Sequence, residues 1–242
     1  MQAGIMRLGQ ALLSYEDKIS VVANNLANAN TPGFKADSLS AFSFDDALSM
    51  QIENSDNRDN LNTMYFAMQN HIDMSQGNLV KTDRSSDIAL SGSGFLVVDT
   101  PQGQYYSRGG MLFVNDEGAL VNAAGDYVLG QNGRIKVGAG EFQIAGNGLV
   151  LSGGNIVGRL RLVDFADYTT LSKADNGYLQ GGGAQKGASA TVMQGYIEQS
   201  NVDITQEYLS MMSLNRNYQT TQTVIQILDQ IHGSEASEIA RL

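Results

Sequence analysis

Apolar residues near the start of the chain recur at spacings that alternate between three and four. Over this stretch they are Ile5, Leu8, Leu12, Tyr15, Ile19, Val22 and Leu26. This rhythm is the a/d pattern of heptads, which places one narrow apolar stripe along a helix. The pattern breaks at Thr31-Pro32-Gly33, because a proline pushes the preceding residue out of the helical region. We therefore predict a helix over about residues 3–29.

The same rhythm returns near the end of the chain. There it is carried by Met211, Leu214, Tyr218, Thr221, Ile225, Leu228 and His232. Asp203 or Thr205 can cap the start of this second helix, and Gly233 can stop it. Since a narrow apolar stripe needs a partner, we expect the two terminal helices to pair as a coiled coil. Antiparallel pairing also predicts that the two ends of the chain lie close together.

The middle of the chain has a different pattern. Of the 27 glycines, 21 lie between Gly92 and Gly187. Turn sequences such as NDEG and QNGR separate short runs of β-branched and aromatic residues, several of them in alternation. These runs are 94–99, 104–108, 111–116, 134–138, 141–145 and 157–165. Closely spaced turns without helical patterns between them indicate antiparallel strands rather than βαβ units.

Together these patterns predict an α+β fold class. In it, long N- and C-terminal helices are paired as a coiled coil, and a central antiparallel all-β domain lies between them. We expect residues 1–35 and 200–242 to form the helical, assembly domain. Residues 36–85 form an extended connecting segment, because their apolar positions show no sustained period. Residues 86–199 form the Gly-rich β domain.

Composition and charge narrow the possible partners. The chain has 242 residues and a net charge of −10, which disfavours the phosphate attraction that nucleic-acid binding needs. It has no cysteine, so disulfides and thiolate metal sites are excluded. No apolar run is long enough to span a bilayer, so we expect no direct membrane insertion. The first residues lack the apolar core of a cleaved signal peptide.

A search for catalytic or ligand-binding chemistry finds little. SGSGF at 91–95 is not followed by the lysine and helix of a phosphate-binding loop. His71 and His232 lie far apart, and no third residue completes a metal or catalytic set with them. The acids at 45–46 and 53–59 lack the alternation of a calcium loop. We therefore expect no enzyme activity, no cofactor and no metal site.

The outer faces of the two helices carry few charges. No charged residue occurs from Ile19 to Phe34, and α-helical residues 204–231 hold only Glu207, Arg216 and Asp229. Amides and hydroxyls cost less to desolvate than ions, so this chemistry favours burial against other protein chains. An ordinary two-helix layer packed on the β part is the alternative. The expected subunit-interface residues are Asn24, Asn25, Leu26, Asn28, Asn30, Thr31, Gly33, Phe34, Asn201, Asn215, Tyr218 and Thr221.

Several motifs together carry a family resemblance. The stretch NNLANANTPGFK at 24–35 resembles the N-terminal signature of the bacterial flagellar rod and hook family. MSQGNL at 74–79, SDIALSGSGFLVV at 86–98 and YSRGGMLFVNDEGALVNAAGDYVLG at 106–130 are similar to its entry into the β domain. QGYIEQSNVDITQEYLSMMSLNRNYQTTQTVIQILDQI at 194–231 is similar to its C-terminal helix. One departure, at Gly109-Gly110, affects only the expected strand register.

The resemblance implies a structural subunit of the flagellar basal-body rod. Such a subunit is exported by the flagellar type III apparatus without a cleaved signal and polymerises helically with copies of itself and other rod or hook subunits. Its terminal helices line the export channel of the drive shaft, and its β domain packs outside. The expected location is therefore the basal body in the cell envelope. Whether the chain is of the proximal-rod or distal-rod type stays open.

Two other functions remain possible from the residues alone. A secreted β-domain binding module carried on a coiled-coil stalk would show the same patterns, but it would form a stable soluble oligomer with ordered ends. A cell-wall hydrolase is the other, because a rod must cross peptidoglycan. No acid pair or zinc motif supports the hydrolase.

Overall fold

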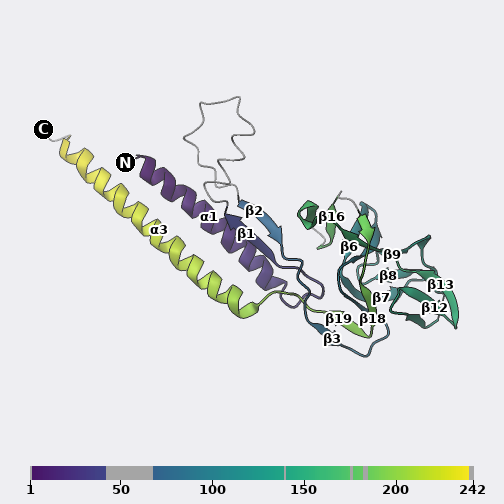
Figure 1. The fold of residues 1–242 in the computed structure, drawn as a ribbon. Coiled ribbons are helices and arrows are strands. Elements are labelled where there is room, and N and C mark those ends of the chain that lie inside the picture. Colours follow the sequence, from purple (N-terminus) through teal and green to yellow (C-terminus); the bar gives the residue numbers. More distant parts are fainter. Residues whose placement is uncertain (1, 42–67, 139, 175–176, 182–184, 240–242) are drawn as a thin grey trace, which may run out of the picture. The chain divides into compact units, whose positions relative to one another are not determined.

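The computed structural model describes residues 2–41, 68–138, 140–174, 177–181 and 185–239. By their contacts these residues form two units (Figure 1). We call Met1–Ala27, Asp37–His71 and Asp203–Leu242 the helical unit, and Asn28–Ala36 with Ile72–Val202 the β unit. The acidic stretch at 45–59 and most of the expected connecting segment lie outside the described residues.

The helical unit contains α1, Gln2–Ala27, and α3, Ile204–Ile239. They lie side by side and run in opposite directions, so that the end of α1 is beside the start of α3 (Figure 1). Asp203 caps α3, because its Oδ1 accepts from the amides of Thr205 and Gln206 at 2.9 and 3.1 Å. Strands β1, Asp37–Ala41, and β2, Met68–Ile72, pair beside α1. Among the described residues, no helix is both long and apolar enough to cross a membrane.

Gly233 does not end the second helix, contrary to the sequence prediction. The helix α3 continues past it to Ile239. A glycine inside a helix costs only about 1 kcal/mol relative to alanine, so neighbouring residues with good helix propensity can carry the helix across it. The first helix ends at Ala27, two residues before the expected end at residue 29.

The predicted fold class is wrong in its central feature, the coiled coil. A coiled coil removes its a and d side chains from water by interlocking them. Here no predicted seam side chain is buried, and among the described side chains of α1 the buried one is the polar Asn25. Spacing of three and four identifies an apolar face on any amphipathic helix, so it does not establish how a neighbouring helix packs. The half-exposed seam positions are Ile5, Leu8, Leu12, Tyr15, Ile19, Val22, Met211, Leu214, Ile225 and Leu228.

The β unit also differs from a compact domain confined to the middle of the chain. It takes in Asn28–Ala36, which precede β1, whereas β1 belongs to the helical unit. Most of its strands form one curled sheet of twelve, in which β15-β16-β6-β5-β9-β8-β7-β4-β18 are successive neighbours. In addition, β10 pairs with β9, and β14 pairs with β5 and β17. Separate small sheets join β11-β12-β13 and β19-β3.

The strands of the β unit are short and pair in antiparallel fashion. The first nine are β3 Leu79–Lys81, β4 Asp87–Ser91, β5 Phe95–Thr100, β6 Gly103–Ser107, β7 Gly109–Val114, β8 Leu120–Asn122, β9 Tyr127–Gly130, β10 Gly133–Arg134 and β11 Phe142–Ile144. The others are β12 Leu149–Ser152, β13 Asn155–Arg159, β14 Leu162–Phe165, β15 Leu171–Lys173, β16 Leu179–Gly181, β17 Gln185–Gly187, β18 Thr191–Gln194 and β19 Tyr196–Glu198. A short 3-10 helix, η1, spans Tyr168–Thr170.

Two apolar clusters form the core of the β unit. Strand β5 contributes to both, with Leu96 in one cluster and Phe95 and Val97 in the other. Alternate residues of a strand point to opposite faces, so β5 is covered on both sides. The first cluster contains Ile88, Leu90, Leu96, Leu112, Leu120, Val128, Ile135, Val137, Phe142, Ile144, Val150, Leu160 and Val192. The second contains Ile72, Phe95, Val97, Tyr106, Leu129, Val163, Phe165, Leu171 and Leu179.

Candidate assembly site

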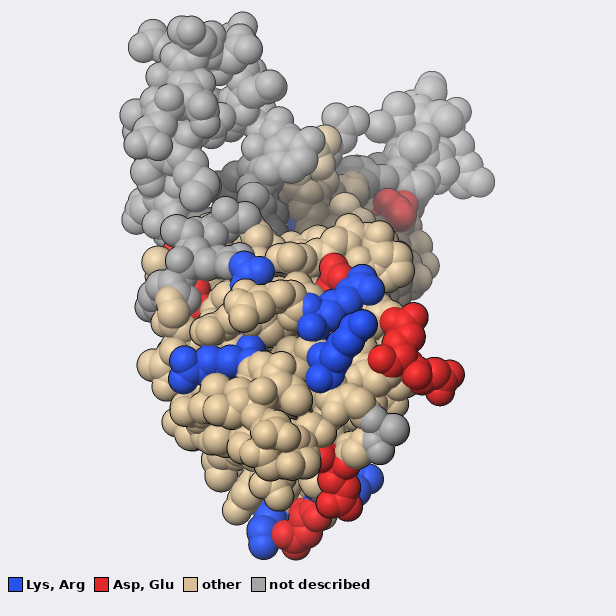
Figure 2. Space-filling model, turned by 90° about the vertical axis from the view of Figure 1, so that its right-hand side faces the viewer, with Lys and Arg blue, Asp and Glu red and all other residues tan. Residues whose placement is uncertain are grey.

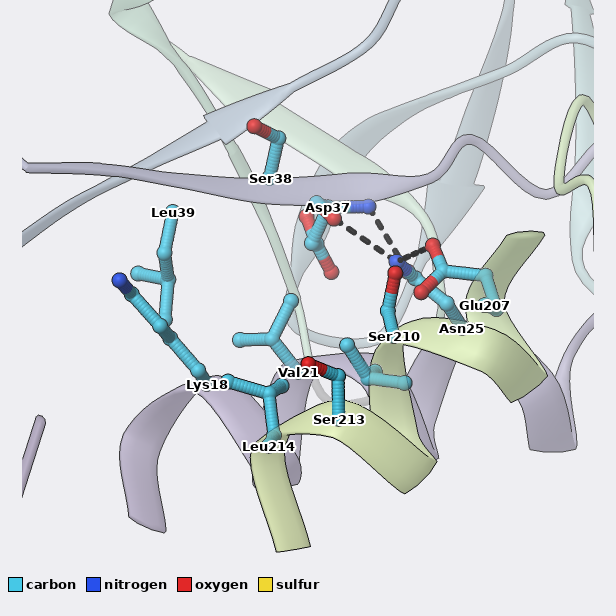
Figure 3. A pocket seen from close by; sticks show the side chains of 11 residues that line it. Lys18, Val21, Asn25, Asp37, Ser38, Leu39, Glu207, Ser210, Ser213 and Leu214 are labelled. Carbon is cyan, nitrogen blue, oxygen red and sulfur yellow. Dashed lines mark hydrogen bonds between the residues drawn. The ribbon is translucent and has the colours of Figure 1, made fainter. Parts of the chain in front are cut away.

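In the helical unit, the side chain of Asn25 joins three elements (Figure 3). Its Oδ1 accepts from the backbone amide of Asp37 at 2.8 Å, and its Nδ2 donates to the Asp37 carbonyl at 2.8 Å. The same Nδ2 donates to Glu207 Oε1 on α3, also at 2.8 Å. Asn25 therefore fastens the start of β1 to α1 in the way that a neighbouring strand would, and it ties α3 to both.

A side-chain amide can make all three bonds, because it has two hydrogens to donate and an oxygen that accepts. A carboxylate at the same position has no hydrogen to donate, and an aliphatic side chain offers neither donor nor acceptor. Asn25 has 1% of its surface exposed, so any partner left without a bond there would also be shielded from water.

We call Asn25 with its partners Asp37 and Glu207 the Asn25 clamp. A groove of about 460 Å³ opens beside this clamp (Figure 3). Helix α1, strand β1 and helix α3 each provide one side of it. Its floor mixes apolar side chains with hydroxyls and three charged groups. The lining residues are Lys18, Val21, Val22, Asn25, Asp37, Ser38, Leu39, Glu207, Ser210, Ser213 and Leu214.

In the β unit, Glu198 at the end of β19 holds two buried cations. Its Oε1 lies 2.6 Å from Lys35 Nζ, and its Oε2 accepts from Arg108 Nε at 3.1 Å. The side chains of all three are 5% exposed or less. Oε1 also accepts from the backbone amide of Gly77 at 3.0 Å. Both carboxylate oxygens are therefore bonded, which is what a buried ion network requires to be tolerated.

The two cations make further bonds to the backbone. Arg108 Nη1 donates to the carbonyls of Gly92 and Gly94, at 2.9 and 2.7 Å. Lys35 Nζ donates to the carbonyl of Ser75 at 2.6 Å. Burial lowers the pKa of Lys35 below its usual value, and the hydrogen bond to Glu198 opposes that shift.

Backbone bonds hold the segment around Lys35 in the same unit. The amide of Gly33 donates to the carbonyl of Glu198 at 2.8 Å, and Gly33 has a φ of +73°, a conformation that glycine adopts without strain. The amide of Ala36 donates to Asn201 Oδ1 at 2.7 Å, and Asn201 Nδ2 donates to the carbonyl of Asp73 at 2.9 Å. The Phe34 ring lies 3.9 Å from Lys173 Nζ. The turn after α1 is thus fitted into the β unit.

The residues expected at subunit interfaces are divided by the structure into three groups. Asn25 is buried, as described above. Those that are half-buried are Leu26, Asn28, Gly33, Phe34, Asn201, Tyr218 and Thr221. Those that are exposed are Asn24, Asn30, Thr31 and Asn215. Their part in contacts between subunits stays a prediction.

Sequence reasoning missed the charged members of both networks. Lys35 was visible as the single charge that closes NNLANANTPGFK, and Glu198 lies inside the motif QGYIEQSNV. Neither motif indicates a partner, because Lys35 and Glu198 are 163 residues apart and Arg108 and Glu198 are 90 apart. Asp37 and Glu207 were equally unforeseen as partners of Asn25.

The described residues could also form a metal-binding group or a charged patch. Within them, no group of three or more His, Asp or Glu side chains is placed to hold a metal ion. On the face in Figure 2, most of the surface is uncharged, and basic and acidic side chains occur in small groups. The candidate site consists of the Asn25 hydrogen bonds, the groove beside them and the buried ion network around Glu198.

Three segments of the chain match family models, and each contributes to the networks above. Residues 14–35 match "Flagella basal body rod protein", 89–152 match "Flagellar hook protein FlgE/F/G D1 domain" and 193–238 match "Flagellar basal body rod FlgEFG protein C-terminal". Lys35, Arg108 and Glu198 come from these three segments in turn.

Curated relatives are similar over nearly their whole length. The flagellar basal-body rod protein FlgF of Caulobacter vibrioides is 31% identical over 233 residues, covering 93% of this chain and 91% of the relative. FlgF of Salmonella typhimurium is 33% identical, covering 88% and 89%. The chain belongs to the flagellar basal-body rod protein family. Another rod protein, FlgG of Bacillus subtilis, is 29% identical over 249 residues, covering 90% of this chain and 92% of the relative.

Membership of the rod family confirms the main functional prediction. The chain is a structural subunit of the bacterial flagellar basal-body rod and not an enzyme, and it assembles with other rod or hook subunits in the basal body. The alternatives of a secreted binding module and a cell-wall hydrolase are set aside by the same finding, since the relatives are named as rod proteins across about nine-tenths of their length.

Proposed function

We propose that this rod subunit polymerises helically through its terminal helices, residues 1–35 and 200–242, to form the drive shaft and its export channel. The observation that carries the proposal is the exposed apolar surface of α3. Large apolar side chains that stay exposed in one chain favour burial against another. On α3 they are Ile204, Tyr208, Leu209, Met212, Val224, Ile227 and Ile231, each 39 to 57% exposed.

The low charge of α3 supports the same proposal. Among its described side chains only Glu207, Arg216 and Asp229 are charged. Burying a helix with few ions avoids most of the desolvation cost that charged side chains bring. A contact that joins two different faces of the subunit and does not close into a ring generates a helical tube, as a rod requires.

Residues near the ends of the helices form the proposed contacts. Asn24, Asn28 and Asn30 supply amides for hydrogen bonds between subunits, and Phe34 anchors the turn that follows α1. The seam positions of both helices pack within and between subunits. We also propose that the flagellar type III apparatus exports the subunit without a cleaved signal, on the basis of the family resemblance.

A matched pair of substitutions tests helix-mediated assembly. Ile227 on α3 and Ile156 on β13 are both exposed, at 50 and 65%. We expect Ile227→Asp to abolish completed basal bodies in cells that lack the native protein, because it buries a carboxylate between subunits. Ile156→Asp changes the same side chain outside the helices and should retain basal bodies and swimming.

A truncation provides an independent check. A chain lacking residues 1–35 should be absent from purified basal bodies and should not restore swimming. Restored swimming with this chain, or normal basal bodies with Ile227→Asp, would show that the terminal helices do not drive assembly. Electron microscopy of the assembled tube then shows which residues line the channel.

A further inference from the structure

Two chain segments of the β unit meet at the Glu198 carboxylate. One is Asn28–Ala36, which follows α1 in the chain, and the other runs from β19 to Val202, which precedes α3. We propose that Lys35, Arg108 and Glu198 form an ionic latch that docks Asn28–Ala36 onto the rest of the β unit, Ile72–Val202, as a separable element. The latch is a conformational device of the subunit and goes beyond its role in the rod.

Each member of the latch comes from a different part of the β unit. Glu198 ends β19, which pairs with β3, and Arg108 lies between β6 and β7 of the large sheet. These two are therefore positioned by strands. Lys35 belongs to no strand and lies on a segment that contributes no residue to either apolar cluster. Besides the latch, this segment is held by backbone bonds, by the Asn201 side chain and by the contact of Phe34 with Lys173. The latch supplies its buried ionic contact.

The charges of the latch are arranged so that Glu198 is shared. Arg108 also donates to the Gly92 and Gly94 carbonyls, and neither bond involves Lys35. Removing Lys35 leaves one buried ion pair, Arg108 with Glu198. Removing the charge of Glu198 instead leaves two buried cations facing each other without an anion, which is far more costly than losing one partner. The latch therefore predicts that neutralising Glu198 loosens the segment more than neutralising Lys35, an order that apolar packing alone does not predict.

Neutral substitutions in the full chain test the latch. In Lys35→Met the aliphatic stem is kept, and in Glu198→Gln the shape of the carboxylate is kept. Hydrogen exchange at three amides reports whether the segment is docked. The amides are those of Gly33, Ala36 and Asp73. Their acceptors are, in the same order, the Glu198 carbonyl, Asn201 Oδ1 and the Ala36 carbonyl. The amides of Val97 and Leu112 in the β core serve as the reference.

We expect Lys35→Met to speed exchange at the three segment amides at least tenfold, and Glu198→Gln to speed it further. The reference amides should change less than twofold in Lys35→Met. Lys81→Met is the matched control, because Lys81 also pairs with a carboxylate, that of Asp83, but both side chains are exposed. It should change neither set of amides.

Three results would overturn the latch. If segment exchange in Lys35→Met stays at the native rate, the ion network does not hold the segment. If the reference amides lose protection in parallel with the segment in Lys35→Met, the network is part of the common core and no separable element exists. An effect of Glu198→Gln no larger than that of Lys35→Met would likewise show that charge is not the holding force.

Discussion

At the scale of single residues, Asn25 links a sequence motif to a role in the fold. The signature NNLANANTPGFK contains four asparagines, and Asn25 is the one that the structure buries. Its amide replaces the hydrogen bonds that the start of β1 would make with another strand. The sequence predicted that amides here are buried in contacts between subunits, and for these contacts that stays a prediction. Asn25 satisfies its own groups within the chain.

The Asn25 clamp predicts that replacing its amide by a carboxylate is destabilising. Asn25→Asp removes the donor to the Asp37 carbonyl and to Glu207, and it sets two carboxylates against each other. We expect a loss of about 2 kcal/mol in the stability of the folded helical unit. In cells, counts of completed basal bodies should fall.

Restoring one donor should restore part of this stability. In Asn25→Asp with Glu207→Gln, the new glutamine can donate to the new aspartate, so basal-body counts should recover in part. Glu207→Gln alone keeps an acceptor for Asn25 and serves as the control. Equal counts in the single Asn25→Asp variant and the double variant would contradict the assignment of Glu207 to the clamp.

Tyr178 makes the stability of the β unit depend on pH in the alkaline range. Its hydroxyl donates to Asp126 Oδ2 and accepts from Asn122 Nδ2, both at 2.6 Å. Burial and the Asp126 hydrogen bond raise the pKa of Tyr178 from 10.0 to about 12. An acid with a raised pKa in the folded state stabilises that state fully below its unfolded pKa, and this contribution is lost as pH rises through the folded pKa.

The expected window is therefore pH 10 to about 12. Tyr178→Phe lacks the titration and the two hydrogen bonds, so it should be less stable than the native protein below pH 10. The difference between their urea midpoints should shrink as pH rises to 12. A constant difference across this range would mean that Tyr178 is not the titrating group.

At the scale of elements, local patterns located strands and helices better than their ends. The predicted runs at 94–99, 104–108 and 111–116 correspond to β5, β6 and β7. Alternation and turn residues act within a few positions, so they are readable without the fold. The end of α3 was missed, because a glycine can stop a helix or be carried through it, depending on its surroundings.

Close packing of two elements explains one glycine in particular. Gly77 lies before β3 and faces the residue that follows β19, and a Cβ at its position would clash with the carbonyl oxygen of Gln199. Gly77→Ala must therefore displace backbone that also carries the amide bonded to Glu198. We expect the β unit to lose about 3 kcal/mol, at the upper end of what overpacking costs.

Gly187 in β17 is the matched control for this substitution. A Cβ there would meet no heavy atom within 4 Å, and its φ is not in the left-handed region. Gly187→Ala should change the urea unfolding free energy of the full chain by less than about 0.5 kcal/mol. Unfolding of the two variants at the same urea concentration would show that close packing does not constrain Gly77.

At the scale of the whole molecule, apolar burial is unequal between the two units. Both buried apolar clusters lie in the β unit, whereas the predicted helix seam is half-exposed. Helices with little tertiary burial are marginal in water. In the proposed assembly, contacts with neighbouring subunits would offset the ordering cost of α1 and α3.

The unequal apolar burial of the two units predicts that their amides differ in protection from hydrogen exchange in the dilute, monomeric subunit. Amides of α1 and α3 should exchange hydrogen at least a hundredfold faster than those of β5 and β9, and they should become protected on assembly. Hydrogen exchange measured before and after polymerisation checks this. Equal protection of α3 and β5 in the monomer would show that the helices are stable without neighbours.

The sequence by itself determined the positions of both helices, many strands, the absence of thiol chemistry and the family. These follow from periodicity, composition and motifs, which act over short distances along the chain. Only the tertiary structure decided that the helices form no coiled coil, that Asn28–Ala36 joins the β unit and that Lys35 and Arg108 share Glu198. Such pairings join residues 90 and 163 positions apart, and no local pattern specifies which distant charge a buried cation will meet.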